Sequence, residues 1–365
     1  MVAALRPGRR HLLAAAATVA GALPAQATEG LRSIAARHGV TYGCAVQADW
    51  LQTDAVYAAA IAREAAALVP EGGAKWWDLR PAEGRFDFSA LDAITGFAAK
   101  HGQVVRGHTL VWHAAMRPWT EAALEAGPAR ARRELEAHLD GVLGHAAGSI
   151  RDWDVANEAV ADPWNSTELL KDSPWLRALG PAYLDLAFRL ARARDLGLTL
   201  TYNDYGCEHD TPHDAEKRRR VLALVRGMLD RGVPIDAVGL QGHLHRDAAF
   251  SAPALASFVR SLRDLGLAVL ITELDVIEPP EPSDPAPRDA AAAAITHAFV
   301  STVLEAGGRA VLTWGITDPY SWANTEPAMA RADGLPGRPL PLDAGFRPKP
   351  MWHALARAFA GQPWP

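Results

Sequence analysis

The feature that most constrains this chain is a regular alternation of short apolar runs with longer amphipathic stretches. Eight runs rich in β-branched or other apolar residues are typical of strands: Thr41–Val46, Ala67–Val69, Val104–His108, Asp152–Ala156, Thr199–Tyr202, Ala237–Leu240, Ala268–Thr272 and Ala310–Thr313. Helical patterns separate them, and the clearest are Asp54–Ala65, Ala129–Ala147, Tyr183–Arg194, Asp214–Arg231, Pro253–Asp264 and Asp289–Glu305. Because strands that alternate with helices form parallel sheets, we predict an α/β fold with a single (β/α)8 TIM barrel.

Length and charge agree with one such domain. The 365 residues, 49% apolar and 22% charged, supply a core for a barrel of this size. The formal net charge of -5, without a basic stripe, argues against nucleic acid or an anionic membrane as a partner. The run Lys217–Arg220 lies in a helical stretch, where we expect it to form a solvated face. We expect a monomer that needs no cofactor.

The first 27 residues have the pattern of an export signal. They contain a basic start with a paired Arg9-Arg10, an apolar stretch over 12–23 and a small-x-small site at 25–27. The paired arginines resemble a twin-arginine signal, and the apolar stretch is too short to span a bilayer. We therefore predict a cleaved signal peptide at 1–27, a catalytic barrel at 28–365 and a periplasmic or extracellular protein with no membrane contact after cleavage. An uncleaved tail is the alternative.

Only two cysteines are present, Cys44 and Cys207. Two cysteines are too few for a disulfide framework or, alone, for a metal site. They lie in distant predicted elements, so we expect that they do not pair.

Polar and aromatic side chains gather directly at or after the predicted strands. They are Glu71 after the second strand, His108 closing the third, Asn157 and Glu158 after the fourth, Asn203 and Tyr205 after the fifth, Gln241 and His243 after the sixth, Glu273 and Asp275 after the seventh and Trp314 after the eighth. The carboxyl ends of all strands of such a barrel meet at one face, which carries the active site. We expect residues more than 200 positions apart to share one cleft.

Two of these residues, Glu158 and Glu273, follow strands on opposite sides of the barrel mouth. Cleavage of a glycosidic bond needs two carboxyl groups, one to protonate the leaving oxygen and one to meet the charge that develops at the anomeric carbon. When the groups lie about 5 to 5.5 Å apart, the second attacks carbon directly and configuration is retained. We predict a retaining β-glycosidase with Glu158 as acid/base and Glu273 as nucleophile.

The neighbours of the two glutamates support this hypothesis. Asn157 has an amide that can bind a sugar hydroxyl or steady the nucleophile. His243 and Asp275 could form a supporting pair in which the imidazole donates to Glu273 and keeps it ionised.

Three tryptophans lie at or just past strand ends, Trp112, Trp314 and Trp322. Indole faces stack on the C–H faces of sugars, so these rings suit the walls of a carbohydrate cleft. The turn between Trp314 and Trp322 would place both rings on one loop over the cleft. Rim packing is the alternative.

Other function classes remain open. His108, His243 and His245 could bind a metal in a metal-dependent barrel hydrolase, but no matching set of ligands stands on neighbouring strands, so we predict no metal. A sugar-binding protein that has lost its activity is a further alternative. The presence of both Glu158 and Glu273 argues against it.

The same residues resemble family 10 of the glycoside hydrolases, the retaining β-1,4-xylanases, over about residues 40–355. The most specific motifs are Arg106–His113, Trp153–Glu158, Tyr202–Tyr205, Gly239–Leu244, Ile271–Asp275 and Thr313–Trp322. The resemblance implies an endo-acting β-1,4-xylanase whose partner is xylan or a xylan-type oligosaccharide. Glu158 matches the acid/base of the family and Glu273 its nucleophile.

The resemblance also implies roles for the surrounding residues. Asn157 and His108 match residues that hold the glycone sugar, the one on the Glu273 side of the cleaved bond. Trp314 and Trp322 match the walls of that site, and Glu71 and Lys75 match contacts to the sugar one step further out. Gln241 and Asn203 match polar partners of the acid/base, and Tyr205 matches a stacking residue on the leaving-group side.

Two positions depart from the family pattern. Gly72 stands where the family has an asparagine, and Ala115 where it has a glutamine. Each missing hydrogen bond would remove about 0.5 to 1.5 kcal/mol of sugar binding. Another β-linked glycan, or a substituted xylan, is therefore the alternative substrate.

Overall fold

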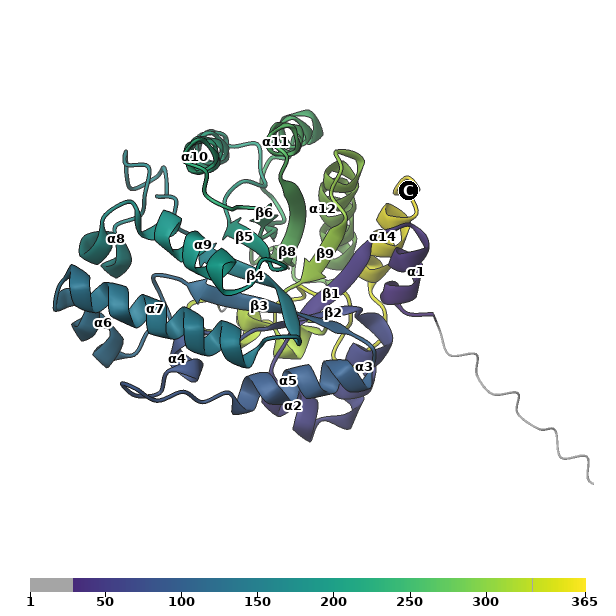
Figure 1. Cartoon of the computed structure of the whole chain (residues 1–365). Helices are drawn as coiled ribbons and strands as arrows, with labels where there is room; N and C mark the ends of the chain where they lie inside the picture. The colour runs from purple at the N-terminus through teal and green to yellow at the C-terminus, as the bar shows by residue number, and fades with distance from the viewer. Residues whose placement is uncertain (1–28, 330) are drawn as a thin grey trace, which may run out of the picture.

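The computed structural model describes residues 29–329 and 331–365, so the predicted signal peptide lies outside the described residues (Figure 1). The strands of the sheet are β1 Thr41–Val46, β2 Ala67–Pro70, β3 Val104–Val111, β4 Ile150–Asn157, β5 Thr199–Asp204, β6 Ala237–Leu240, β7 His243–His245, β8 Ala268–Ile277 and β9 Ala310–Thr313. All neighbouring pairs are parallel, and the pairing of β6 with β8 and of β9 with β1 closes the barrel. The predicted (β/α)8 barrel is confirmed.

Helices surround the barrel between its strands (Figure 1). They are α1 Leu31–Arg37, α2 Ala48–Thr53, α3 Ala55–Glu64, α4 Trp76–Leu79, α5 Ser89–Lys100, α6 Pro118–Glu125, α7 Pro128–His145, α8 Pro174–Leu179, α9 Tyr183–Arg194, α10 Pro212–Asp230, α11 Ala252–Asp264, α12 Pro285–Glu305, α13 Trp322–Thr325 and α14 Pro350–Phe359. The first helix, α1, and the last, α14, lie side by side, purple against yellow. Short 3-10 turns, Asp318–Tyr320 and Pro327–Met329, flank α13.

Several strands run further toward the cleft than the apolar runs predicted. Strand β4 includes Asn157, which pairs in register with Asn203 of β5. Strand β8 continues to Ile277, because its outer end pairs with β7, and His243 lies opposite Asp275. The polar side chains of the barrel mouth are therefore part of the hydrogen-bonded sheet, and the sheet fixes their spacing.

A tryptophan in the barrel wall packs against a glycine on the neighbouring strand. Trp153 of β4 is fully buried, and Gly107 of β3 is its partner in register. A Cβ atom at Gly107 would overlap the indole ring of Trp153. The close contact of β3 and β4 therefore depends on a residue without a side chain at position 107.

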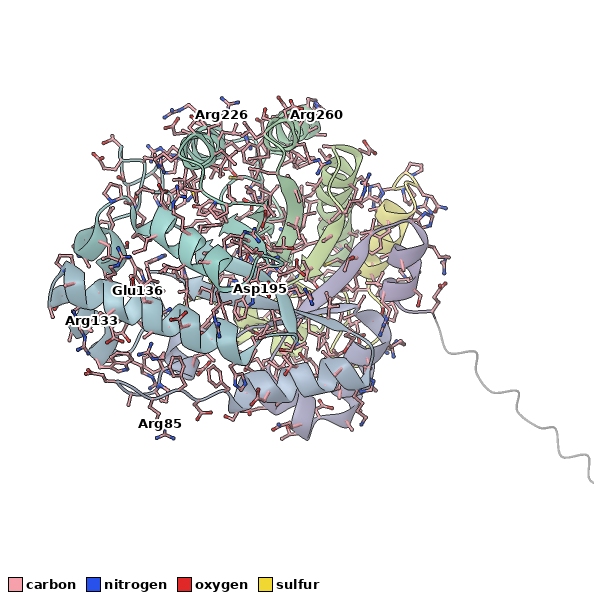
Figure 2. All side chains as sticks on the ribbon, viewed as in Figure 1. Arg85, Arg133, Glu136, Asp195, Arg226 and Arg260 are labelled. Atoms are coloured by element: carbon pink, nitrogen blue, oxygen red, sulfur yellow. The ribbon has the colours of Figure 1, made fainter. Side chains whose placement is uncertain are left out.

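The expected solvated face at Lys217–Arg220 is wrong. Lys217 is fully buried, Arg218 and Arg220 are largely buried, and Arg219 alone points to solvent. Positions 217, 220 and 221 share the inner face of α10 because a helix repeats every 3.6 residues. The solvated side of α10 instead carries residues such as Arg226, which projects outward in Figure 2.

Two further expectations concern the chain as a whole. Cys44 and Cys207 are both buried and free, which confirms that they do not pair. Within residues 29–329 and 331–365, no helix combines the length and the apolar character needed to cross a bilayer.

Candidate active site

A cleft of about 800 Å³ opens at the carboxyl ends of the strands. Of the residues predicted for the site, those that line it are Glu71, Lys75, His108, Trp112, Asn157, Glu158, Tyr205, Gln241, His243, Glu273, Trp314 and Trp322. The remaining two, Asn203 and Asp275, are fully buried and contact the lining residues from below. The expected convergence on one cleft therefore holds.

Glu273 is held as an anion at the bottom of the cleft. Asn203 Nδ2 donates to its Oε1 at 2.6 Å, and His243 Nε2 lies 3.5 Å from its Oε2. Burial of the carboxyl raises its pKa, but electrostatic interactions with His108, His243 and Lys75, together with the hydrogen bond from His243, lower the pKa to about 2. Glu273 is consequently ionised at neutral pH, as a nucleophile must be.

His243 is itself oriented by a buried carboxylate. Its Nδ1 lies 2.8 Å from Asp275 Oδ1, and Trp322 Nε1 donates to Asp275 Oδ2 at 2.6 Å. Burial lowers the pKa of His243, but the charges and hydrogen bonds of Asp275 and Glu273 raise it well above the ordinary value. The expected His243–Asp275 pair is present, and a protonated imidazole faces Glu273.

Glu158 is held by three side-chain donors. Trp112 Nε1 donates to its Oε2 at 2.8 Å, while Gln241 Nε2 and Asn157 Nδ2 donate to its Oε1 at 3.0 and 3.2 Å. Its backbone is left-handed, with φ 55°, which costs a residue with a side chain about 1 to 2 kcal/mol. The backbone N–H of Glu158 donates to Asn203 O at 2.9 Å and so fixes this conformation.

An amide network links the two glutamates. Asn157 Oδ1 accepts from Asn203 Nδ2 at 2.9 Å and from Gln241 Nε2 at 3.3 Å. Asn203 was expected beside the acid/base, and its backbone oxygen does contact Glu158, but its side chain donates to Glu273. The correction has a simple cause: the side chain of Asn203 points toward β8, where Thr272 Oγ1 also donates to it at 2.6 Å.

His108 lies beside Glu273 and is fixed from below by a carboxylate that the sequence argument missed. Asp154 Oδ2 lies 3.0 Å from His108 Nδ1, and Arg106 binds the other oxygen of Asp154. The ring of Trp314 stands edge-on to His108, with centroids 5.3 Å apart. Asp154 lies three residues before Asn157 on β4, inside the predicted strand rather than at its end.

At one end of the cleft, Lys75 lies between two indoles. Its Nζ is 4.9 Å from the ring centroid of Trp112 and 5.6 Å from that of Trp314. Burial raises the pKa of Glu71, against the hydrogen bond from Gln47 and the charge of Lys75. Gln47 also lines the cleft, and the sequence argument overlooked it although it directly follows the first strand.

The two positions that depart from the family pattern lie at the same end. Gly72 and Ala115 both line the cleft. A Cβ at Gly72 would lie 3.0 Å from Asp78 Oδ2, so Asp78 occupies part of the space that a larger residue would need. Ala115 has a left-handed backbone with φ 51°.

At the other end, Tyr205 lies near Glu158. Its hydroxyl donates to Asp162 Oδ2 at 2.9 Å and accepts from Lys171 Nζ at 3.0 Å. Burial raises the pKa of Tyr205, and the charges of Asp162 and Glu158 raise it further. Lys217 Nζ lies 4.6 Å from the ring centroid. These contacts hold the ring as a neutral wall of the cleft.

The comparisons with known proteins agree with this geometry. The model of "Glycosyl hydrolase family 10" matches residues 30–358. The chain belongs to glycosyl hydrolase family 10. It is 33% identical to "Endo-1,4-beta-xylanase 1" of Humicola insolens, over 94% of this chain and 77% of that protein.

Solved structures of family 10 enzymes are also similar. Xylanase 10B from Thermotoga petrophila RKU-1, in complex with xylobiose, is 28% identical with a TM-score of 0.82 and covers 91% of this chain and 97% of its own. Native xylanase 10B from Thermotoga maritima is 29% identical with a TM-score of 0.81, covering 91% of this chain and 98% of its own. The family is a family of glycoside hydrolases, so the chain is an enzyme of that class.

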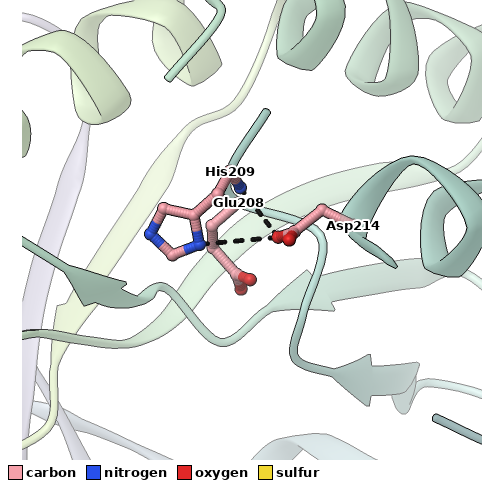
Figure 3. A group of neighbouring side chains, drawn as sticks. All are labelled: Glu208, His209 and Asp214. Carbon is pink, nitrogen blue, oxygen red and sulfur yellow. Dashed lines mark hydrogen bonds and ion pairs between the residues drawn. The ribbon is translucent and has the colours of Figure 1, made fainter. Parts of the chain in front are cut away.

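One buried cluster of this family 10 chain has the composition of a metal site, Glu208, His209 and Asp214 (Figure 3). The backbone N–H of His245 donates to His209 Nε2 at 3.0 Å, so the proton of a neutral ring is on Nδ1, 3.4 Å from Asp214 Oδ1. Neither ring nitrogen then has a lone pair free for a metal. Glu208 Oε1 accepts the N–H of Gly242 at 3.0 Å. The cluster therefore fixes loops that line the cleft.

The histidines of the metal alternative do not form a shared site. Both nitrogens of His243 face carboxylates of the catalytic centre, and His108 Nδ1 faces Asp154. Within the described residues, His108, His243 and His245 are not among the groups of side chains close enough to share an ion. The arrangement of the three rings does not support a metal-dependent hydrolase.

Proposed function

We propose that this enzyme is an endo-acting β-1,4-xylanase that cleaves xylan with retention, with Glu273 as nucleophile and Glu158 as acid/base. One observation carries the assignment. In a family 10 chain, both carboxyls line one cleft and are joined by an amide network, and the pKa of Glu273 is lowered to about 2 by its interactions with His108, His243 and Lys75.

In the first step, Glu273 attacks the anomeric carbon of the sugar on the glycone side. The glycosidic C–O bond breaks, and the proton of Glu158 passes to the leaving oxygen, so that a neutral alcohol departs. In the second step, the Glu158 carboxylate takes a proton from water, which attacks the same carbon and releases Glu273. Two inversions at one carbon give net retention.

The contacts of Glu158 suit a group that must both give and take a proton. Trp112 and Gln241 hold its two oxygens in place through hydrogen bonds of 2.8 and 3.0 Å. Both donors are neutral, so they orient either protonation state without adding charge. We propose that Asn157 and His108 hold the sugar beside Glu273, and that Trp314 and Trp322 form its walls.

The names of the similar proteins support xylan as the substrate, and the residues at the glycone end determine how tightly its distal sugar is bound. Xylobiose, which is present in the structure of the Thermotoga petrophila enzyme, consists of two xylose units joined by the β-1,4 linkage of a xylan chain. Because Gly72 offers no side-chain hydrogen bond there, we expect weaker hold on the distal glycone sugar than an asparagine would give. Turnover compared over a panel of plain xylan, substituted xylans and other β-linked glycans separates xylan from the alternative substrates.

The assignment of roles is tested with Glu158→Ala, Glu273→Ala and the control Glu136→Ala. Glu136 lies on α7 (Figure 2) and does not line the cleft. Both cleft variants should lose at least about a thousandfold in turnover of xylan, and the control should not. On an aryl xylobioside with a good leaving group, Glu158→Ala should keep its first step, because that departure needs no proton. Near-normal turnover of xylan by both cleft variants would contradict the assignment.

We also propose that the protein is exported as a monomer after cleavage between Ala27 and Thr28. The intact mass of protein recovered outside the cytoplasm of an expressing host should correspond to residues 28–365, and light scattering should give one chain per particle. Replacing Arg9 and Arg10 with lysine should retain the protein in the cytoplasm if the twin-arginine pattern is used. A full-length mass outside the cell would contradict cleavage.

A further inference from the structure

Trp164 is an exposed indole that the proposed mechanism does not use. It lies on the loop between β4 and α8, lines the cleft, and is 54% exposed. Large aromatic side chains bury their rings in most folded proteins, because exposed aromatic surface is costly. Packing in the core therefore does not explain why a tryptophan stands at position 164.

The neighbours of Trp164 place it at the leaving-group end. Its ring centroid lies 6.4 Å from that of Tyr205, with the planes at 39°, and 6.1 Å from that of His213. Tyr205 and Glu158 line the same cleft, and each follows closely on the register pair Asn157 and Asn203 at the ends of β4 and β5. Since Glu158 is the proton donor to the leaving oxygen, sugars that pass Tyr205 belong to the leaving part of the chain, and Trp164 comes next.

The loop that carries Trp164 is fixed to α10 by a buried guanidinium. Arg220 donates to the carbonyl oxygens of Ala161, Glu168 and Ser166 at 3.1, 3.0 and 2.8 Å. An arginine suits this task because its planar fork offers several donors in fixed directions.

Lys217, one turn earlier on α10, holds the start of the same loop. Its Nζ donates to Val160 O at 2.8 Å and lies 3.2 and 3.1 Å from carboxylate oxygens of Asp162 and Asp204. Asp162 also accepts from Tyr205, so one buried cluster sets both the loop and the Tyr205 ring. A ring held in place before binding loses little freedom when a ligand stacks on it.

We propose that Trp164 forms an additional sugar-stacking position at the leaving-group end of the cleft, beyond Tyr205, and that Arg220 is its positioning residue. The ligand is a β-1,4-linked xylose unit of the leaving chain, bound through its C–H face. This inference rests on the proposed function and adds to it a residue that determines chain-length preference and the site of cleavage.

The test uses xylohexaose labelled with ¹⁸O at its reducing end, with products resolved by mass. In Trp164→Ala the ratio of kcat/KM on xylohexaose to kcat/KM on an aryl xylobioside should fall about three- to tenfold, because the aryl substrate places no sugar beyond Tyr205. Cleavage should move toward the reducing end, because binding modes with many leaving-group sugars lose a contact. Trp164→Phe should restore most of the ratio.

Two control variants separate this role from a general effect. Leu196→Ala changes an apolar side chain that is 82% exposed and lies outside the cleft, and it should leave both readouts unchanged. Trp77→Ala removes the exposed indole near Lys75 at the opposite end, and any movement of the cleavage site should be away from the reducing end. A shift by Trp77→Ala in the same direction as Trp164→Ala would contradict the inference.

The positioning role is tested with Arg220→Lys, which keeps the charge but cannot reach three carbonyls at once. It should reproduce part of the Trp164→Ala shift while its melting temperature shows that it is folded. If the wild type does not cleave xylohexaose, the proposed function itself is wrong. If the wild type cleaves it and Trp164→Ala keeps the wild-type ratio and cleavage pattern, only the present inference is wrong.

Discussion

Glu158 and Glu273 are the same residue type, and the groups around them give them different tasks. Glu273 has an imidazole paired with a buried carboxylate, His243 with Asp275, directed at it. Glu158 has only neutral donors, the indole of Trp112 and side-chain amides. The charged neighbours of Glu273 favour the ionised form that a nucleophile needs.

The first prediction concerns pH and the variant His243→Asn. A cation stabilises a carboxylate, so its removal raises the pKa of Glu273 from about 2. The acidic limb of kcat/KM should therefore move up by about 1 to 3 pH units, the range expected for loss of one close opposite charge. His353→Asn, an exposed histidine on α14, is the matched control. An acidic limb that stays in place in His243→Asn would show that another group keeps Glu273 ionised.

A second prediction concerns the glycone end and the variant Gly72→Asn. The backbone at Gly72 has an ordinary negative φ, so an asparagine fits once the carboxylate of Asp78, 3.0 Å from the new Cβ, moves slightly. The added amide can bind a sugar hydroxyl, and KM for xylotriose should fall about two- to tenfold. An unchanged or higher KM would mean that Asp78 already binds that sugar.

At the scale of elements, the predicted strands and helices were confirmed because apolar periodicity depends on burial, which the barrel supplies. The predicted ends of several strands were too early, because polar residues such as Asn157 still pair in the sheet. The expectation of a solvated face at Lys217–Arg220 was wrong for a different reason. Charge predicts exposure only when no buried partner exists, and here the carboxylates that pair with Lys217, those of Asp162 and Asp204, belong to other elements of the fold.

A third prediction concerns the contact between β3 and β4. Gly107→Ala places a methyl group against the buried Trp153 ring and should reduce the free energy of unfolding by about 1 to 3 kcal/mol or more. Gly96→Ala, in the middle of α5 with open space around it, is the matched control and should increase it by about 0.5 to 1 kcal/mol. Urea unfolding of both variants gives the comparison. Equal stability of the two would mean that the Trp153 ring moves without cost.

At the scale of the whole molecule, strand order brings together residues that the sequence separates by more than 200 positions. The sequence identified both catalytic candidates because each directly follows an apolar run predicted as a strand, and the carboxyl ends of all strands lie at one face of a barrel. It did not identify the direction of the Asn203 amide, the exposure of Trp164 or the Glu208 cluster. Those depend on loop paths and rotamers, which periodicity does not determine.

A fourth prediction concerns the two thiols. Cys44 and Cys207 are buried and free, and burial raises the pKa of both. A thiol reagent should therefore react with neither in the folded protein and with both after unfolding, and a reductant should leave the melting temperature unchanged. A melting temperature that falls in reductant would indicate a disulfide.

The most direct test of the central claim is to trap the covalent intermediate. A 2-deoxy-2-fluoro xylobioside with a good leaving group should form the glycosyl-enzyme and hydrolyse it slowly, because fluorine destabilises both charged transition states. Peptide mass mapping should find one added disaccharide, on Glu273, and none in Glu273→Ala. An adduct on another carboxylate would contradict the account. So would an enzyme that is not inactivated and that hydrolyses a xylobioside to a product of inverted configuration.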